Sequence, residues 1–360
     1  EMLTFERVEM DGASTYQVAL RKDRMVEYLS KLAPELLLYP ENARFIFNDD
    51  TRKLDLNQPA VIGRTLDIQA SIKSINEKIA AGEHSIPLEF IFADPPVKDD
   101  ATAEQLQIKE LVGSHTTYFR GSSAERLQNI RAASSRFHGV LVAPGETFSM
   151  ANQLGNISLD NGYAEAMIIF GDQTIKGVGG GVCQVSTTLF RAVFFTGFPV
   201  VERHAHAYRV SYYEQVAGGR NENFAGLDAT VFVPIVDFQF TNDTPYWLLM
   251  EVYVVPSNSS ITWKFYSTSD GRTVEWNTSG LTNVTKPPEP QFKENSKLAS
   301  NEIKQIEWSA DGAQVTVTRR VLRNGSLYFE DSFFTNYQPW RAVYEYGPET
   351  DPKLLEELQK

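Results

Sequence analysis

The sequence of 360 residues contains one cysteine, Cys183, so an internal disulfide is excluded, as is the Cys-x-x-Cys pairing of many zinc sites. Long apolar runs are missing too, because no stretch approaches the roughly twenty apolar residues of a membrane-spanning helix. Positive charge is scarce: 34 Lys and Arg face 46 Asp and Glu, which gives a net charge of −12. This balance argues against a nucleic-acid-binding surface and against a polybasic grip on anionic lipid.

A secretory leader is not visible at the N-terminus, where the chain begins Glu1-Met2-Leu3 inside what already resembles a folded segment. We therefore expect that a native signal or anchor segment has been removed, and we draw no cytoplasmic location from its absence. The length predicts two or three domains, each able to bury its own core. A hydrophobic fraction of 42% is somewhat low but still that of a globular protein.

The surroundings of Cys183 are the most informative feature that is present. Gly179, Gly180 and Gly181 precede it and permit a tight turn or the close approach of another molecule. Apolar residues then recur from Val185 at roughly helical spacing, which predicts a helix with Cys183 at its N-terminus. Free amides and the helix dipole at that end favour a thiolate, so the pattern suits a nucleophile. A small buried cysteine at the start of a well-packed helix is the alternative.

Two histidines and an aspartate follow Cys183 in the sequence, and together with the thiol they could form a catalytic group. The segment 200–210 has the β-branched and aromatic content of a strand, and period two places His204 and His206 on one face. Asp228 follows a glycine turn before another predicted strand. A nucleophile, a base and an orienting carboxylate are available in this order. Only one histidine is expected within hydrogen-bond reach of the sulfur, and Asp228 is alternatively an Asx-turn residue.

The chain resembles the VanW family from about Gly113 to Tyr253. The resemblance rests on several segments in a fixed order: Thr116–Phe119, Arg126–Asn129, Pro144–Ser149, Gly162-Tyr163, Gly179–Leu189, Glu202–His204 with His206, and Asp228–Val231. Residues from about Arg44 to Leu88 resemble, less strongly, a peptidoglycan-binding domain that often precedes VanW domains. The tail from about Lys297 to Tyr346 resembles small β domains such as G5.

These resemblances, together with the pattern of predicted elements, give a multidomain α+β protein. We expect a small α+β peptidoglycan-binding domain at residues 1–100, a mixed α+β VanW-like catalytic domain at 101–285 and a small all-β G5-like domain at 286–360. Within them the patterns predict helices at 18–38, 65–81 and 124–137. A hairpin is predicted around Arg323-Asn324-Gly325.

The resemblance implies a bacterial cell-envelope protein, outside the cytoplasmic membrane or in the cell wall, that acts on peptidoglycan. It further implies an L,D-transpeptidase that crosslinks stem peptides through a thioester on Cys183. His204 or His206 would serve as base, with Asp228 as orienting group. Backbone amides of the 181–184 turn suit an oxyanion. Substrate-binding candidates are Gly179, Gly180, Gly181, Gln184, Ser186 and Glu146.

Other functions remain open at this stage. Cys183, His204, His206 and Asp228 together offer the ligand types and number of a zinc site. A non-catalytic scaffold that binds the cell wall is a third possibility, with a buried cysteine and histidines satisfied by neighbours. The catalytic hypothesis requires no cofactor. Its partners are peptidoglycan stem peptides and glycan strands, without nucleic acid, and with a membrane only through an anchor absent from this chain.

Overall fold

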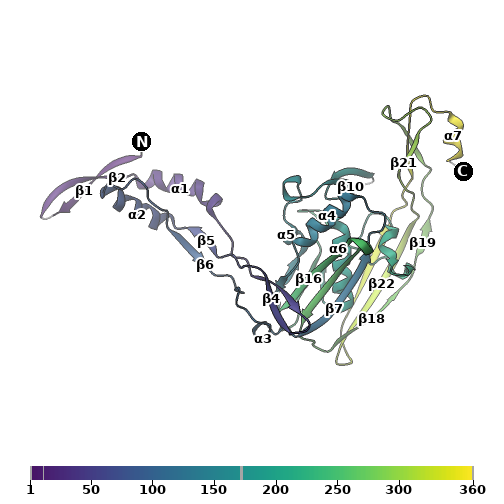
Figure 1. Ribbon diagram of the computed structural model, residues 1–360, viewed down its shortest axis with the longest axis horizontal. Coiled ribbons are helices and arrows are strands. Elements are labelled where there is room, and N and C mark those ends of the chain that lie inside the picture. Colours follow the sequence, from purple (N-terminus) through teal and green to yellow (C-terminus); the bar gives the residue numbers. More distant parts are fainter. Residues whose placement is uncertain (1, 11, 171–172, 359–360) are drawn as a thin grey trace. The chain divides into compact units, whose positions relative to one another are not determined.

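The computed structural model describes residues 2–10, 12–170 and 173–358, and it is a mixture of helices and strands (Figure 1). The predicted α+β class is therefore confirmed. The residues divide into two compact units, Glu1–Ile46 with Asp55–Ala101 and Phe47–Leu54 with Thr102–Lys360. Within the described residues, no helix combines the length and apolar character needed to cross a membrane.

Two helices and a hairpin build the first unit. The hairpin pairs β1 (Leu3–Met10) with β2 (Ala13–Leu20). Helix α2 (Ile68–Ala80) packs beside β2 and against α1 (Lys22–Leu36). The core is made where the apolar faces of the two helices meet, through Met25, Leu29, Ile72 and Ile75, together with Leu66 from the strand that precedes α2. Both helices were predicted, but residues 18–20 are strand rather than helix because they pair with the start of β1.

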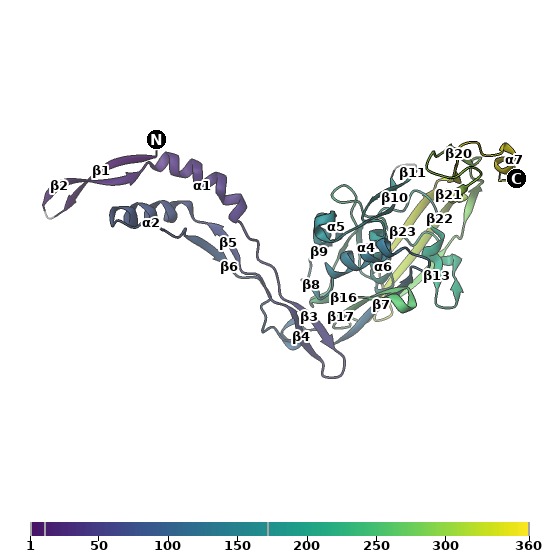
Figure 2. The same ribbon diagram turned by 45° about the horizontal axis from the view of Figure 1, so that its top comes forward.

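The remaining strands of this region form short pairs. β3 (Arg44–Asn48) pairs with β4 (Lys53–Gln58), and β5 (Gly63–Leu66) pairs with β6 (Phe90–Ala93), as Figure 2 shows. The tip of the β3–β4 hairpin belongs to the second unit, where the ring of Phe47 stacks on Tyr266 with 4.9 Å between centroids.

An antiparallel sheet forms one layer of the second unit. Its order is β7 (Glu110–Tyr118), β17 (Ser260–Ser267), β16 (Leu248–Val255) and β8 (Val140–Val142). Alternating residues of β17, among them Ile261, Trp263 and Phe265, are fully buried and face the interior. This layer supports the helices that carry the site.

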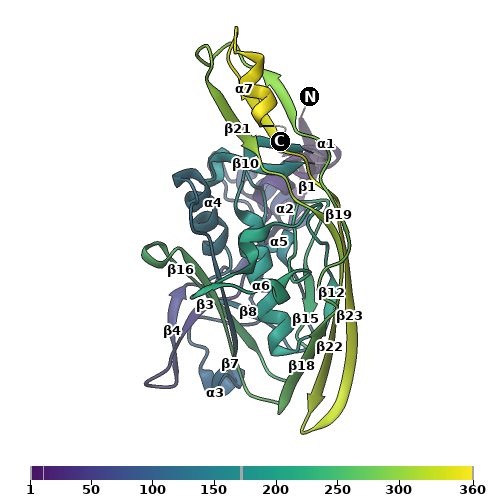
Figure 3. The same cartoon turned by 90° about the vertical axis from the view of Figure 1, so that its right-hand side faces the viewer.

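Helix α6 (Val182–Thr196) lies at the centre of the second unit. It packs against β7 and β17 on one side, and the hairpin of β22 (Gly312–Arg323) and β23 (Ser326–Tyr337) runs along another side (Figure 3). Six of its apolar residues are completely buried: Val185, Leu189, Phe190, Ala192, Val193 and Phe194. Val315, Val317 and Tyr337 of the hairpin join the same core. The predicted turn at Asn324-Gly325 is confirmed, since both residues have positive φ.

Three further elements surround the N-terminal end of α6. Helix α4 (Ala124–Ser135), predicted over 124–137, is capped by Ser123, whose side chain accepts a hydrogen bond from the Arg126 amide. The hairpin of β10 (Glu165–Phe170) and β11 (Gln173–Val178) leads into the glycine turn. A small sheet pairs β12 (Val200–Glu202), β15 (Gln239–Thr241) and β9 (Thr147–Ser149).

Short elements complete the second unit. They are α3 (Ala103–Leu106), α5 (Met150–Leu154), β13 (Gln215–Val216), β14 (Gly219–Arg220), β18 (Arg272–Thr278), β19 (Thr282–Thr285), β20 (Gln291–Glu294), β21 (Ile303–Glu307), β24 (Val343–Tyr346) and α7 (Pro352–Glu357). β18 and β19 both pair with β22.

Candidate active site

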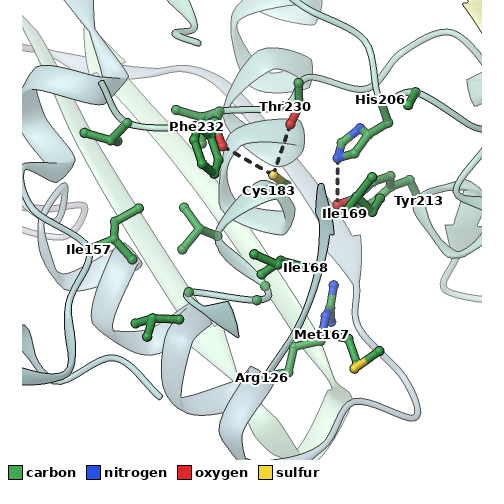
Figure 4. A pocket seen from close by; sticks show the side chains of 18 of the residues that line it. Arg126, Ile157, Met167, Ile168, Ile169, Cys183, His206, Tyr213, Thr230 and Phe232 are labelled. Carbon is green, nitrogen blue, oxygen red and sulfur yellow. Dashed lines mark hydrogen bonds between the residues drawn. The ribbon is translucent and has the colours of Figure 1, made fainter. Parts of the chain in front are cut away.

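A cavity of about 730 Å³ opens over the N-terminal end of α6. Cys183 lines it, together with His206 and residues from the β10–β11 hairpin (Figure 4). Most of the other lining side chains are apolar: Ile157, Met167, Ile168, Ile169, Val178, Val182, Val231, Phe232, Val233 and Ile235. The cavity therefore offers a thiol and an imidazole inside a largely apolar wall, which suits a ligand with few specific polar contacts.

The three glycines line this cavity, and the structure gives each of them a reason. Gly179 and Gly181 have φ of +93° and +114°, in the region that favours glycine. A Cβ on Gly180 would stand 2.4 Å from the carbonyl oxygen of Met167. Asn129 fixes the turn, because its Nδ2 donates to the carbonyl oxygens of Gly180 and Ala164, each at 2.9 Å. Backbone conformation thus requires glycine at 179 and 181, and packing against the protein's own chain requires it at 180.

Cys183 is the second residue of α6, and its neighbourhood leaves backbone donors open. The amides of Val182 and Gln184 bond to the carbonyl oxygens of Gly179 and Gly181. Those of Gly181 and Cys183 have no partner among the described residues. The sulfur lies 3.3 Å from the Thr230 hydroxyl and 3.7 Å from the Val231 carbonyl oxygen. A charged oxygen formed beside Cys183 would find two free amides at a helix N-terminus.

His206 and Asp228 form a buried pair next to the thiol. The Nδ1 atom of His206 lies 2.6 Å from Oδ2 of Asp228, and the His206 amide donates to the same oxygen at 2.8 Å. Both side chains are at most 5% exposed. This double contact fixes the ring and directs Nε2 toward the cavity, where it also lies 3.5 Å from the Tyr213 hydroxyl. The carboxylate does not make the Asx turn that was the alternative.

Two residues complete the surroundings of Asp228. Arg203 donates through Nε to the Asp228 carbonyl oxygen at 2.7 Å, and its Nη2 lies 3.4 Å from Oδ1. The Tyr337 hydroxyl donates to Oδ1 and accepts a hydrogen bond from the Gly226 amide. Because each carboxylate oxygen is held by donors, Asp228 remains ionised in a buried place.

The electrostatic consequences favour a charged thiol. Burial opposes ionisation of Asp228, but His206, Arg203 and Tyr337 together hold its pKa well below the usual range. Burial also opposes the charged form of His206, yet Asp228 and Cys183 raise its pKa to about 10. Burial raises the pKa of the Cys183 thiol, and His206 with Thr230 more than offsets this, so the pKa falls to about 7. Near neutral pH the pair is therefore poised to be thiolate and imidazolium.

The structure separates the two histidines. His204 does not line the cavity: it is exposed, and its Nε2 lies 2.9 Å from Oε1 of Glu202. The strand predicted over 200–210 is wrong beyond Glu202, because β12 ends there and only a single bridge joins His204 to Thr230. The chain bends after this bridge, so alternation no longer places His204 and His206 on one face.

Three predicted substrate-binding residues lie outside the cavity. Gln184 is completely buried and bonds to Thr117 and Arg126, because its helical position turns it toward β7. Ser186 is also completely buried, one turn into α6. Glu146 is exposed and accepts a hydrogen bond from the Ala143 amide within its own turn. Gln184 and Glu146 thus hold local structure, and none of the three side chains lines the cavity.

A zinc site does not fit the arrangement. Among the described residues, no group of three or more His, Cys, Asp and Glu side chains is placed to hold a metal ion. His204 does not line the cavity that Cys183 lines, and both Oδ atoms of Asp228 already accept hydrogen bonds.

Sequence reasoning assigned no role to Arg203, Tyr213, Thr230 or Tyr337, all of which contact the catalytic candidates. Arg203 and Thr230 stand inside segments that carry the VanW resemblance, so a signal for them existed. Tyr337 lies 109 residues from Asp228 in the chain and had none.

Two stretches of the chain match known protein families. Residues 125–266 match the family model "VanW like protein", and residues 5–86 match the model "Putative peptidoglycan binding domain". The chain therefore carries a VanW-like domain that contains Cys183, His206 and Asp228, and the resemblance seen in the sequence is confirmed.

Individual relatives are similar over part of their length. The chain is 37% identical over 147 residues to "Uncharacterized protein YoaR" of Bacillus subtilis, which covers 41% of the chain and 45% of the relative. It is 27% identical over 116 residues to "Vancomycin B-type resistance protein VanW" of Enterococcus faecalis, which covers 32% and 40%. The matches thus span less than half the length of either relative.

Among solved structures, an IgA1 protease G5 domain matches 22% of the chain and 94% of that domain, at 14% identity and a TM-score of 0.14. A TM-score this low carries no argument about the fold of the C-terminal region.

Proposed function

We propose that this protein acts on peptidoglycan at the bacterial cell wall and that Cys183, His206 and Asp228 catalyse acyl transfer between stem peptides, as an L,D-transpeptidase. The observation that carries the proposal is the buried His206–Asp228 pair, with a 2.6 Å contact, beside a thiol that opens into a cavity. The VanW-like match and the peptidoglycan-binding match support the location and the substrate class.

The first step forms a thioester. The Cys183 thiolate attacks the carbonyl carbon between the third and fourth residues of a stem tetrapeptide, and the oxyanion accepts hydrogen bonds from the free amides of Gly181 and Cys183. The carbon–nitrogen bond then breaks. The imidazolium of His206 gives its Nε2 proton to the leaving nitrogen, so the fourth residue departs as an amino acid with a neutral amino group.

The second step resolves the thioester and restores the thiolate. The side-chain amine on the third residue of a neighbouring stem attacks the thioester carbonyl carbon. Neutral His206 accepts one proton from this amine, the carbon–sulfur bond breaks and an amide crosslink is formed. Asp228 stabilises the imidazolium each time it appears, through Nδ1. Water in place of the amine would make the same site a carboxypeptidase.

A non-catalytic scaffold is the second candidate function. In its favour, the wall of the cavity is mostly apolar, and a peptidoglycan-binding match precedes the VanW-like domain. It does not account for the direction in which the pKa of Cys183 is shifted, since burial alone would raise that pKa. We therefore place acyl transfer first.

Mass spectrometry of the intact protein tests the proposal. After incubation with a stem tetrapeptide, the mass of the wild-type chain should rise by that of the tripeptidyl acyl group, while Cys183→Ala should gain no mass. Addition of an amine acceptor should remove the adduct and yield the crosslinked peptide. A wild-type chain that binds the tetrapeptide and stays unmodified would place the protein among wall-binding scaffolds.

A further inference from the structure

Arg126 brings a positive charge into the cavity that contains Cys183. It is the third residue of α4, and Figure 4 shows its side chain pointing into the pocket. Its Nη1 donates to the Ser122 hydroxyl at 2.5 Å, and its Nη2 donates to Oε1 of Gln184 at 3.0 Å. The guanidinium carbon lies 5.0 Å from the centre of the Tyr212 ring. All these partners are neutral.

The neighbouring arginines are placed differently. Arg203 lies against Asp228, while Arg209 and Arg220 share Glu214 at 2.7 Å and 2.6 Å. Within the described part of the chain, no carboxylate lies within ion-pair distance of Arg126. A guanidinium held by neutral groups retains its attraction for an anion and has donors left to bind one.

The position of Arg126 is tied to that of the nucleophile. Gln184, which follows Cys183 in α6, accepts the hydrogen bond from Arg126 and is itself held by Thr117 at 2.6 Å. The guanidinium is therefore fixed relative to the sulfur before any ligand enters. Arg126 also lines a second cavity of about 750 Å³, which shares Met167, Ile169 and Tyr212 with the first. It thus stands at the boundary of the space beside the thiol.

We propose that Arg126 recognises the free carboxylate of the amino acid that leaves when Cys183 is acylated. This inference rests on the proposed function. In a tetrapeptide donor, one carbon atom separates that carboxylate from the nitrogen of the bond that breaks. A planar guanidinium binds a carboxylate through two parallel hydrogen bonds, so it positions this end of the donor. The site accordingly selects donors whose scissile bond is the last peptide bond of the stem.

Two peptides and two variants test this role. The wild-type chain should be acylated about 10- to 100-fold faster, as kcat/KM, by the tetrapeptide acid than by its C-terminal carboxamide, the range of one charged hydrogen bond. Arg126→Gln should lose a similar factor with the acid and change less than about threefold with the amide. Arg131→Gln, which removes an exposed charge from the same helix, should match the wild type with both peptides.

The outcomes separate this inference from the proposed function. Acylation of the wild type by both peptides at equal rates, or an equal loss with both in Arg126→Gln, overturns the role of Arg126 and leaves transpeptidation intact. If Arg126→Gln unfolds, Arg126→Lys replaces it, and the acid preference should shrink because an ammonium lacks the planar fork.

A binding measurement decides the case in which the wild type shows no acylation, so that the proposed function has failed. Calorimetry on Cys183→Ala then compares the acid with the amide. If Cys183→Ala binds the acid more tightly than the amide, and the double variant that also carries Arg126→Gln does not, carboxylate recognition is supported. Equal binding of the two peptides by Cys183→Ala refutes it.

Discussion

The two ends of α6 are both built around buried charges, yet they differ in how completely those charges are satisfied. At the C-terminal end Arg319 is fully buried and donates to the carbonyl oxygens of Phe194 and Phe198. Its Nε and Nη2 bind both carboxylate oxygens of Asp331, at 2.9 Å and 2.5 Å. This arrangement closes the helix end and fixes β22 and β23 to it.

At the N-terminal end the network stays open on one side. Asp228 is held by Arg203, Tyr337 and His206, but the chain of contacts ends in the thiol of Cys183, which faces a cavity. The amides of Gly181 and Cys183 lack partners among the described residues. A closed network contributes stability alone, whereas an open network keeps groups available for a ligand. Completeness of hydrogen bonding therefore distinguishes the C-terminal end of α6 from the end at which we propose the active site.

The largest effect on the acylation rate should come from substituting His206, with His204 as the comparison. His206→Ala should lower the rate of acylation by about 10²–10⁴-fold, since the general acid and base is lost. Without the imidazolium, which lowers the pKa of Cys183, that pKa should rise, so iodoacetamide should react far more slowly at pH 7.5. Intact-mass kinetics and alkylation measure both effects.

His204→Ala is the matched control, because the His204 side chain is exposed and, among the described residues, its hydrogen-bond partner is Glu202. Both rates should stay within about twofold of wild type, as expected for a surface substitution. Equal losses in the two variants would contradict the assignment of His206 as the base.

Substitutions at the C-terminal end of α6 should lower the stability of the fold and leave the reactivity of Cys183 unchanged. Arg319→Met leaves Asp331 and two carbonyl oxygens without their donor, and we expect a loss of about 3 kcal/mol in the free energy of unfolding. Urea unfolding measures it. Arg320→Met is the control: it changes the next residue of β22 and removes an exposed ion pair with Glu275. It should lower the free energy of unfolding by less than about 1 kcal/mol.

In the folded fraction of Arg319→Met, the alkylation rate of Cys183 should equal that of wild type. A change in the pKa of the thiol would show that the two ends of α6 are coupled, and the distinction between them would fail.

Asp228→Asn should change the pH dependence of the thiol with a smaller effect on rate. In the wild type the pKa of Cys183 is lowered to about 7 and that of His206 is raised to about 10, so the thiolate–imidazolium pair exists between these values. An amide cannot stabilise the imidazolium, so the pKa of His206 falls, and the pKa of Cys183 rises toward or beyond the usual 8.5. Acylation near pH 7.5 should slow by about 10- to 100-fold.

Iodoacetamide kinetics from pH 5 to 10 give the two midpoints directly. A variant whose lower midpoint stays at about 7 would remove Asp228 from the catalytic group. It would then be a residue of the local structure only.

The sequence predicted the parts of the site that depend on local patterns. Glycines followed by apolar residues at helical spacing predicted the helix that became α6, Val182–Thr196, with Cys183 in its first turn. Asp228 was expected to reach the histidine segment, and it does so at His206. Local pattern was sufficient here because the turn and the helix adjoin in the chain.

Long-range contacts explain what the sequence could not predict. Alternation placed His204 and His206 on one face, but the amide of Gln338 donates to the Ala207 carbonyl oxygen, and the segment leaves the strand after a single bridge. Tyr337 reaches Asp228 only because β23 packs along the core of α6. A contact between residues this far apart leaves no periodic trace in the sequence.

Tyr337→Phe gives the smallest expected effect and tests whether the open network extends into β23. The hydroxyl donates to Oδ1 of Asp228, while Oδ2 keeps its two contacts with His206, so the imidazole should hold its place. Loss of one donor destabilises the Asp228 carboxylate slightly, and acylation should slow by about three- to tenfold. Tyr328→Phe on the same strand is the control, since that ring is exposed. An unchanged acylation rate in Tyr337→Phe, with a reduced melting temperature, would assign Tyr337 to the structural side of the comparison.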